Sequence, residues 1–280
     1  MLSLSFLTLQ SWACIRSRVA GFCLLTLAAF AANASVVITG TRIIYPAPAR
    51  EVSVQIKNVG QVPALVQVWL DRGDDTAQPG SPEAQTPFVL TPPIARLEPS
   101  RGQTIRLMYS SEEILPADRE SLFYFNLLDI PPKPSSDAEA VQQRNMLQLA
   151  VRSRLKLFYR PEALKGISSD AAWKQIKWHL VPSADKSDAL AIELENPTPF
   201  YVNLQRAAAV MQGAAADAES SPLVEAVMLA PFSTTRFEVS PAARSLTQAA
   251  SVLRLQIIND YGGVSQLDAP QAAQVVKTQP

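Results

Sequence analysis

Residues 145–161 constrain the fold of this chain more than any other segment, because their pattern predicts one β-strand of about 13 residues, roughly twice the usual length. Apolar residues recur there at every second position, which places their side chains on one face of the strand. These positions are Leu147, Leu149, Val151, Leu155 and Leu157. Positive residues stand among them at Arg152, Arg154 and Lys156. Two different partners along the strand would explain its length.

Short segments with the same alternation recur from Val36 onward, separated by turn residues, as in a β-sandwich. About seven such strands in about 110 residues match the strand count of an immunoglobulin-like domain. The Thr91-Pro92-Pro93 run predicts a point where a strand ends or changes sheets, because proline cannot donate to a strand ladder. Residues 131–144 are polar and aperiodic, which predicts a mobile loop.

The strand pattern restarts after Pro161 and predicts a second, smaller β domain. Its predicted strands are residues 176–181, 190–194, 201–210, 224–229, 235–239 and 252–258. Residues 267–280 are expected to form a loose tail. We therefore predict an all-β fold with two domains, at residues 35–161 and 162–280.

Residues 1–34 have the pattern of a signal peptide. Arg16 and Arg18 precede an apolar run at residues 19–32, which suits a signal-peptide core and is short for a membrane span. The triplet Ala32-Asn33-Ala34 then predicts cleavage before Ser35. The region is unusually long, so a start codon placed too far upstream and a retained anchor stay open as alternatives.

Few residues could support catalysis or metal binding. Both cysteines, Cys14 and Cys23, lie in the leader, so the mature chain can form no disulfide. The single histidine, His179, lies in a strand-like segment without the partners that a general base requires. A formal net charge of zero excludes a sequence-wide attraction to nucleic acid. We therefore expect no enzyme activity, cofactor or metal.

The positive residues of the long strand are the best candidates for a binding site. Arg152 and Arg154 are expected to be solvated residues of an outer face. Lys156 lies close to the domain boundary, where its ammonium should open into the cleft between the domains and could bind an anion. Arg42 is a second candidate, because the first strand of a sandwich can run beside the last.

Six specific motifs cover almost the whole mature chain. They are TRIIYP at 41–46, TPPIARLEP at 91–99, LPADRESLFYFNLLDIPP at 115–132, LKLFYRP at 155–161, ENPTPFYV at 195–202 and INDYGG at 258–263. In this order they resemble the periplasmic chaperones of the chaperone–usher pilus pathway, the PapD-like family.

The resemblance implies two immunoglobulin-like domains in an L or boomerang arrangement, in the periplasm of a Gram-negative bacterium. Such chaperones work without ATP: they bind, fold and cap pilus subunits that lack a final strand, by lending them their long edge strand. They then deliver the subunits to an outer-membrane usher. A self-capping dimer would cover the same edge in the free protein.

The family's functional residues transfer to this chain through the matching motifs. The donor residues, which fill the groove of the subunit, would be Met146, Leu147, Leu149 and Val151. Arg42 and Lys156 match the two cleft residues that hold the subunit's terminal carboxylate and so fix the register of insertion.

Glu120, Arg160 and Asp260 match an interdomain charge network that sets the angle between the domains. Lys156 and the donor residues differ in parity, so strong twist or a bulge between Arg152 and Arg154 would be needed to bring them to one face.

Two departures and two alternatives accompany this interpretation. The loop at residues 131–144 is longer than in short-loop chaperones but lacks the cysteine pair of the long-loop branch, which favours the short-loop branch. The second domain also lacks a disulfide that some relatives carry.

Two alternative functions predict other patterns. A pilus subunit or adhesin would carry an amino-terminal donor extension, and a carbohydrate-binding β-sandwich would need an exposed aromatic platform. Neither pattern is evident.

Overall fold

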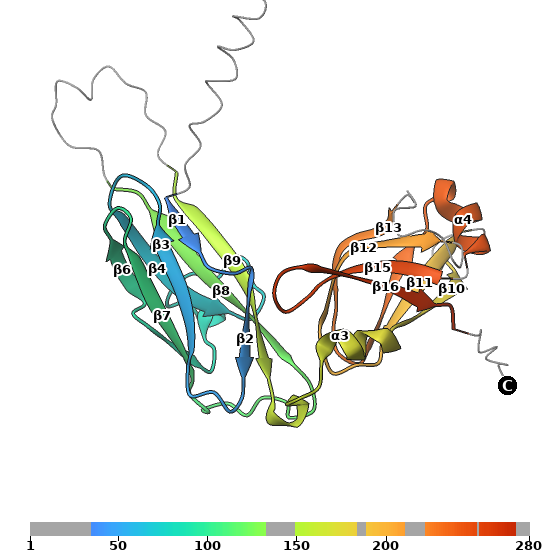
Figure 1. The fold of residues 1–280 in the computed structure, drawn as a ribbon, viewed down its shortest axis with the longest axis horizontal. Helices are drawn as coiled ribbons and strands as arrows, with labels where there is room; N and C mark the ends of the chain where they lie inside the picture. The colour runs from blue at the N-terminus through green and yellow to red at the C-terminus, as the bar shows by residue number, and fades with distance from the viewer. Residues whose placement is uncertain (1–34, 133–148, 184–188, 211–221, 251, 273–280) are drawn as a thin grey trace, which may run out of the picture.

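The chain forms two β-sandwiches that meet at an angle (Figure 1). This computed structural model describes residues 35–132, 149–183, 189–210, 222–250 and 252–272. The prediction of an all-β fold with two immunoglobulin-like domains is confirmed. In these ranges no helix is long and apolar enough to cross a membrane.

The first domain packs a four-stranded sheet against a five-stranded sheet. Its strands are β1 (Val36–Ile38), β2 (Arg42–Pro46), β3 (Val52–Asn58), β4 (Ala64–Asp71), β5 (Phe88–Thr91), β6 (Ile94–Leu97), β7 (Gly102–Tyr109), β8 (Ser121–Ile130) and β9 (Val151–Arg160). A single turn of 3-10 helix, η2 (Pro82–Ala84), lies between β4 and β5. The strand orders are β1-β3-β7-β5 and β2-β9-β8-β4-β6.

Two short connections move the chain between these sheets. β1 and β2 lie in different sheets, and so do β5 and β6. The second change occurs at Pro92 and Pro93, as predicted, because the missing N–H groups interrupt the ladder there. β2 then runs parallel to β9, with Arg42 opposite Lys156 and Pro46 opposite Arg160. The expectation that the first strand runs beside the last is therefore confirmed.

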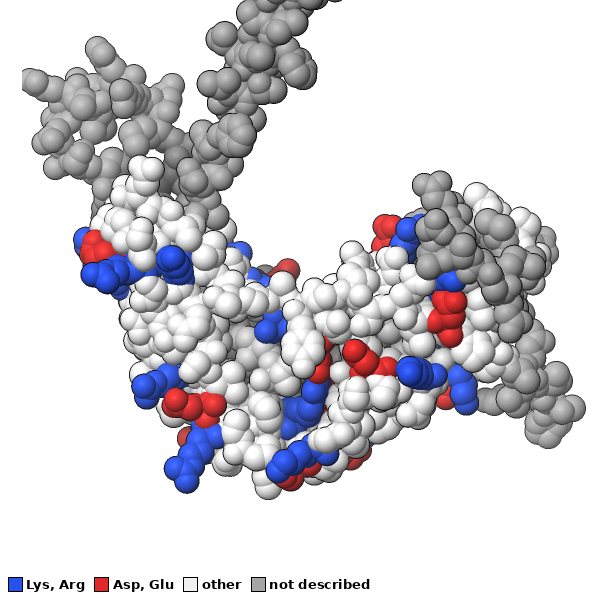
Figure 2. Space-filling view, viewed as in Figure 1, with Lys and Arg blue, Asp and Glu red and all other residues white. Residues whose placement is uncertain are grey.

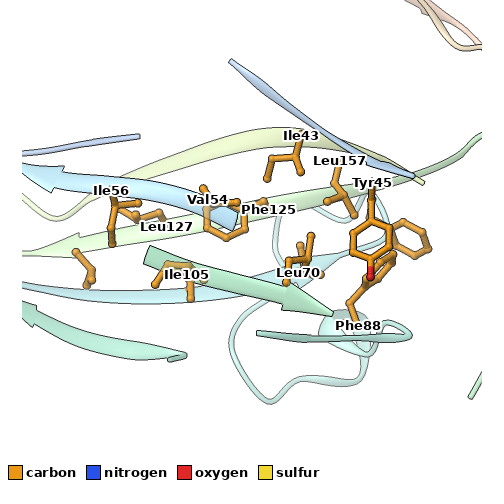
Figure 3. Packing of buried hydrophobic residues seen from close by; sticks show 14 of the residues in the cluster. Ile43, Tyr45, Val54, Ile56, Leu70, Phe88, Ile105, Phe125, Leu127 and Leu157 are labelled. Atoms are coloured by element: carbon orange, nitrogen blue, oxygen red, sulfur yellow. The ribbon is translucent and has the colours of Figure 1, made fainter. Parts of the chain in front are cut away.

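The core of this domain lies between the two sheets (Figure 3). Ile43 and Tyr45 of β2 alternate with less buried neighbours, and Leu157 of β9 packs beside them. Rings of Tyr45, Phe88 and Tyr159 close one end of the core, with centroids 5.4–6.2 Å apart. Each such side chain contributes about 1.5–3 kcal/mol by burial, so this end of β2 and β9 is firmly held.

The long strand is shorter than predicted among the described residues. β9 begins at Val151, and Leu149 and Ala150 precede it without strand structure. Met146, Leu147 and most of the predicted loop at 131–144 lie outside the described residues. Pairing with β8 runs without a register shift from Asp129 opposite Val151 to Ser121 opposite Tyr159. The bulge suggested between Arg152 and Arg154 is therefore wrong.

The second domain packs a three-stranded sheet, β10-β11-β14, against a four-stranded sheet, β13-β12-β15-β16. Its strands are β10 (Lys177–Pro182), β11 (Leu190–Asn196), β12 (Val202–Val210), β13 (Pro222–Leu229), β14 (Ser233–Glu238), β15 (Val252–Ile258) and β16 (Val264–Pro270). Its short helices are η3 (Glu162–Leu164), α3 (Ser169–Ala172), η4 (Trp173–Gln175), η5 (Pro241–Ala243) and α4 (Arg244–Ala249).

The carboxyl-terminal part of this domain corrects one prediction. The expected loose tail begins inside β16, which pairs with β15 along its whole length. Ala269 of β16 is buried, and its carbonyl accepts a hydrogen bond of 3.1 Å from Trp178 Nε1. The tail prediction failed because weak alternation in VSQLDAP hides an edge strand whose partner is a neighbouring hairpin strand.

Candidate functional site

The two edges of β9 differ. On one edge β8 pairs with β9 from Val151 to Tyr159, whereas on the other edge β2 pairs only from Lys156 to Arg160. Within the described part of the chain, residues 151–155 therefore have no strand partner on the β2 side. An unpaired row of N–H and C=O groups is a template for adding another strand.

Apolar side chains accompany this open edge. Leu149 and Val151 are 64% and 51% exposed. They share the parity of Leu155 and Leu157, which pack in the domain core. A strand added at this edge would therefore bring its own sandwich into contact with an exposed apolar row, and covering each side chain would stabilise the contact.

Lys156 lies on the opposite face of β9, together with Phe158 and Arg160, and faces the second domain. Its Nζ donates to Asn203 Oδ1 of β12, and the ring of Phe158 lies 5.7 Å from that of Tyr201. The strand thus presents apolar side chains on one face and a cleft cation on the other, and simple alternation explains the parity difference.

Arg42 and Lys156 form a pair of cations without a carboxylate partner. Arg42 Nη1 donates to the Ile258 carbonyl at 2.8 Å, and its buried Nε has no hydrogen-bond partner in the described ranges. Among the described residues, no carboxylate oxygen lies within 4.0 Å of either side chain's nitrogen atoms. Burial lowers the pKa of Lys156, and the adjacent Arg42 guanidinium lowers it further. Burial also lowers the pKa of Arg42, which Asp260 partly opposes.

Both neutral partners of these cations come from the second domain, and sequence reasoning missed them. Ile258 ends β15, and Asn203 lies near the start of β12. Asn203 directly follows the ENPTPFYV motif and is a buried polar residue in an apolar strand start, which is the signal that could have identified it.

Arg160, four residues beyond Lys156, has the opposite electrostatic situation. Its guanidinium donates to Glu120 Oε1 at 2.7 and 2.9 Å and to Asp260 at 2.9 and 3.2 Å. Ser169 Oγ also donates to Asp260, at 3.2 Å. The three predicted network residues therefore lie together at the domain junction. Figure 2 shows basic and acidic side chains close together on the surface between the two domains.

Glu120 connects this network to the second domain through its backbone as well. Its N–H donates to the Pro199 carbonyl, and its Oε2 accepts from the Tyr201 N–H, both at 2.9 Å. Burial raises the pKa of Glu120, while Arg160 and the Tyr201 N–H act in the opposite direction. The β15–β16 hairpin supplies Asp260 and reaches toward the first domain (Figure 1).

Close packing holds this hairpin against the first domain. A Cβ at Gly262, whose φ is +84°, would lie 2.3 Å from Thr41 Oγ1. The positive φ and this close approach together favour glycine at position 262, the first glycine of the INDYGG motif.

The prediction of solvated side chains for Arg152 and Arg154 is wrong. Arg154 donates to both oxygens of Asp71, a fully buried carboxylate, and Arg152 Nη2 lies 3.6 Å from it. Asn126 joins them: its Nδ2 donates to Asp71 at 2.7 Å, and its Oδ1 accepts from Arg152 at 2.8 and 3.0 Å. The guanidinium carbon of Arg152 lies 4.9 Å from the ring centroid of Trp69, and that of Arg154 lies 3.9 Å from the ring centroid of Tyr124.

The arrangement offers a strand edge and a pair of cations for binding. In the part of the chain that the structure describes, no group of three or more His, Cys, Asp or Glu residues could hold a metal ion. An open strand edge instead ends at two cations that lack an anion. The fold and site define a two-domain immunoglobulin-like protein that can accept an extended strand.

Comparison with known proteins identifies the family. Residues 35–165 match the family model described as pili and flagellar-assembly chaperone, PapD N-terminal domain, and residues 171–269 match pili assembly chaperone PapD, C-terminal domain. The chain belongs to this family of pilus-assembly chaperones. The prediction of a fimbrial chaperone, rather than a pilus subunit or a carbohydrate-binding module, is confirmed.

Individual relatives agree over most of their length. The probable fimbrial chaperone YadV of Escherichia coli K12 is 42% identical over 252 residues, which cover 88% of this chain and 95% of YadV. The chaperone protein HifB of Haemophilus influenzae is 41% identical over 243 residues, covering 87% and 90%. The crystal structure of the YadV chaperone superposes with a TM-score of 0.64 at 37% identity, over 85% of this chain and all of that structure. The crystal structure of the Pseudomonas aeruginosa CupB2 chaperone also superposes with a TM-score of 0.64, at 32% identity, over 84% of this chain and all of that structure.

Proposed function

We propose that this protein binds pilus subunits that lack a strand and supplies residues 149–155 as the missing strand until the subunit passes to an outer-membrane usher. The observation that carries the proposal is the open edge of β9, which ends at two cations without a carboxylate partner. Backbone pairing along the edge supplies affinity, and the exposed apolar row fills the groove of the subunit.

The direction of the captured strand follows from charge. A strand in the open position would lie in line with β2, ending or beginning beside Arg42. If the strand runs parallel to β9, its terminal carboxylate lies between Arg42 and Lys156. If it runs antiparallel, its amino-terminal end meets two positive charges. Coulomb energy therefore favours the parallel direction and places the carboxyl terminus of the subunit in the cleft.

The second domain completes the cleft. Asn203 and the Ile258 carbonyl hold Lys156 and Arg42 in the free protein. Neither neutral oxygen balances a positive charge, so an incoming carboxylate is the better partner for both cations. The network of Glu120, Arg160 and Asp260 maintains the angle between the domains and so keeps the two halves of the cleft in reach of one another.

The remaining predictions belong to the same proposal. Cleavage before Ser35 releases the chain into the periplasm, and the domain boundary lies at Pro161. The protein acts without ATP or cofactor and is not an enzyme. Residues Met146 and Leu147 extend the donor row, and in the free protein a second copy covers the open edge.

The test is subunit capture by the two cleft cations. Arg42→Ala and Lys156→Ala, each coexpressed with a pilus subunit, should lose recovery of the complex from periplasmic extracts. Removing one partner of a desolvated charged pair costs about 2–5 kcal/mol, which is at least about a thirtyfold loss of affinity. Arg106→Ala is the matched control, because Arg106 is an exposed arginine on β7 in the other sheet.

Circular dichroism should show that each variant stays folded. Normal yields of complex with both cleft variants would contradict the anchor assignment. Loss of the complex with the Arg106 control as well would indicate a general charge effect rather than a defined carboxylate site.

A further inference from the structure

A buried carboxylate at the end of β8 lacks part of its hydrogen bonding. Asp129 is 7% exposed and lies opposite Val151, the first residue of β9. Its Oδ2 accepts a hydrogen bond from Ser35 Oγ, whereas its buried Oδ1 has no hydrogen-bond partner among the residues that the structure describes. A buried carboxylate oxygen without a donor is costly, so a missing donor is expected near Ser35.

Ser35 is firmly seated beside this carboxylate. Its carbonyl accepts hydrogen bonds from the Val59 N–H at 2.7 Å and the Gly60 N–H at 3.2 Å. A Cβ at Gly60 would lie only 3.1 Å from Ser35 Cβ, so the turn closes tightly over the serine. The next residue, Val36, is buried and pairs with Asn58. The position of Ser35 is therefore set by the folded domain.

The backbone nitrogen of Ser35 is a candidate for the missing donor, because it belongs to the residue that already contacts Asp129. Three covalent bonds of about 1.5 Å each join this nitrogen to Ser35 Oγ, so the two atoms lie within about 4 Å of one another. Ser35 Oγ is the atom that donates the hydrogen bond to Asp129. While the leader is attached, this nitrogen is an amide with one hydrogen and no charge. Once the leader is removed, it is an α-ammonium with three hydrogens and a positive charge.

We infer that Asp129 is the binding site for the mature amino terminus, and that the α-ammonium of Ser35 forms an ion pair with its carboxylate. Hydrolysis of the peptide bond between Ala34 and Ser35 adds one water: Ala34 keeps the new carboxylate, and the new amine of Ser35 takes up a proton. The buried carboxylate thereby gains the charged donor that it lacks before cleavage.

This ion pair joins the two sheets of the first domain. Ser35 precedes β1 of the four-stranded sheet, and Asp129 lies on β8 of the five-stranded sheet. It lies directly beside the start of the open edge of β9. Removal of the leader thus adds an ion pair between the two sheets at the end of the sandwich where β9 and its donor row begin. The inference rests on the predicted cleavage before Ser35 and does not depend on subunit capture.

The test measures the reactivity of the α-amino group in the purified mature protein. Intact mass first establishes that the chain begins at Ser35. A dilute amine-reactive ester is then applied near neutral pH, and labelling of the amino-terminal peptide is followed by mass spectrometry. An opposite charge within about 4–6 Å shifts a pKa by about 1–3 units, so Asp129→Asn should accelerate this labelling at least about tenfold.

Three comparisons make the result specific. Asp129→Glu keeps the carboxylate and should leave labelling slow, and Ser35→Ala keeps the ammonium and should do the same. The exposed Lys57 of β3 serves as the internal reference, whose labelling should be equal in all variants. Equal α-amino reactivity in the wild type and Asp129→Asn would overturn the inference.

A measurement on the wild type alone covers the case in which Asp129→Asn does not fold. The pH dependence of labelling reports the pKa of the α-amino group, whose ordinary value is about 7.7–8.0. A value raised by about one unit or more supports the ion pair, and an ordinary value overturns it. A chain that begins at another residue also overturns it, whereas subunit capture by that chain would leave the proposed function intact.

Discussion

The two halves of β9 differ in what they leave unpaired. One half has an edge of unpaired backbone N–H and C=O groups, and the other half has a cation without a carboxylate partner. Residues 151–155 have one open edge, yet their cations are bound to a buried carboxylate. Residues 156–160 are paired on both edges, yet within the described residues Lys156 donates to a neutral oxygen and has no carboxylate partner. Residues 151–155, the open half, can therefore pair with another strand through their backbone, whereas residues 156–160 can bind an anion through Lys156.

The paired cations explain how half of a strand stays in place with one neighbour. Arg152 and Arg154 connect β9 to Asn126 of β8 and Asp71 of β4. This network crosses three strands on the face opposite the donor row. It keeps residues 151–155 against the sheet, so the open edge is presented in an extended form before a subunit arrives.

The largest effect is expected where that network is removed. Asp71→Ala leaves two half-buried guanidinium groups without their carboxylate and should lower the free energy of unfolding by about 3–5 kcal/mol. Urea unfolding followed by tryptophan fluorescence measures it. Asp118→Ala is the control, because Asp118 pairs with Arg119 on the surface and its loss should leave the urea midpoint close to that of the wild type. Equal effects of both variants would remove the distinction between the halves.

The donor role of the open half is tested by a charge in its apolar row. Leu149→Glu should weaken subunit capture by about 1–3 kcal/mol, because the carboxylate would enter an apolar groove. Ile167→Glu, at a similarly exposed apolar residue in the second domain, should leave capture unchanged. Coexpression of each variant with a pilus subunit, followed by quantification of the complex recovered from periplasmic extracts, measures both. Unchanged affinity for Leu149→Glu would show that the donor row is misassigned.

The interdomain network should have a smaller effect on stability and a visible effect on shape. Asp260→Asn removes one of the two carboxylates on Arg160 and should cost about 1–2 kcal/mol. Small-angle scattering should then report a broader range of interdomain angles. Asp268→Asn is matched, since Asp268 pairs with Arg254 in the same hairpin but within the second domain. A scattering profile identical to that of the wild type would exclude a role in setting the angle.

The smallest effect concerns the free protein at neutral pH. Lys156→Met should raise the free energy of unfolding by on the order of 1 kcal/mol at most, because it removes a partly buried charge beside Arg42. The folded-state pKa of Lys156 lies below the unfolded value of 10.5. The folding penalty of the charged form is therefore complete below the folded pKa and disappears as pH rises toward 10.5.

Wild type and Lys156→Met should consequently converge in stability at high pH, and the variant should be the more stable one at neutral pH. Urea midpoints measured across this pH range test the expectation. A less stable variant at neutral pH would show that Lys156 is already satisfied by Asn203. The free cation would then be no mark of a binding site.

Local pattern was sufficient for much of the fold. Period-two alternation predicted most strands of both domains, because burial of one sheet face imposes that period on the sequence itself. The first domain nevertheless has nine strands rather than about seven, and the edge strand β16 was missed. The proline run at Thr91 likewise marks a change of sheet. Motifs such as LKLFYRP were enough to select Arg42, Lys156 and Arg160 before their positions were known.

Only the tertiary structure decided which side chains from distant strands contact one another. Asp71 lies 83 positions from Arg154 in the sequence, and Asn203 lies 47 positions from Lys156. Nothing in the local pattern of either segment encodes that register. Alternation shows which side chains share a face, but the neighbours of β9 decide what the cations on that face meet. Arg152 and Arg154 meet a buried carboxylate, whereas Lys156 meets a neutral oxygen of the second domain.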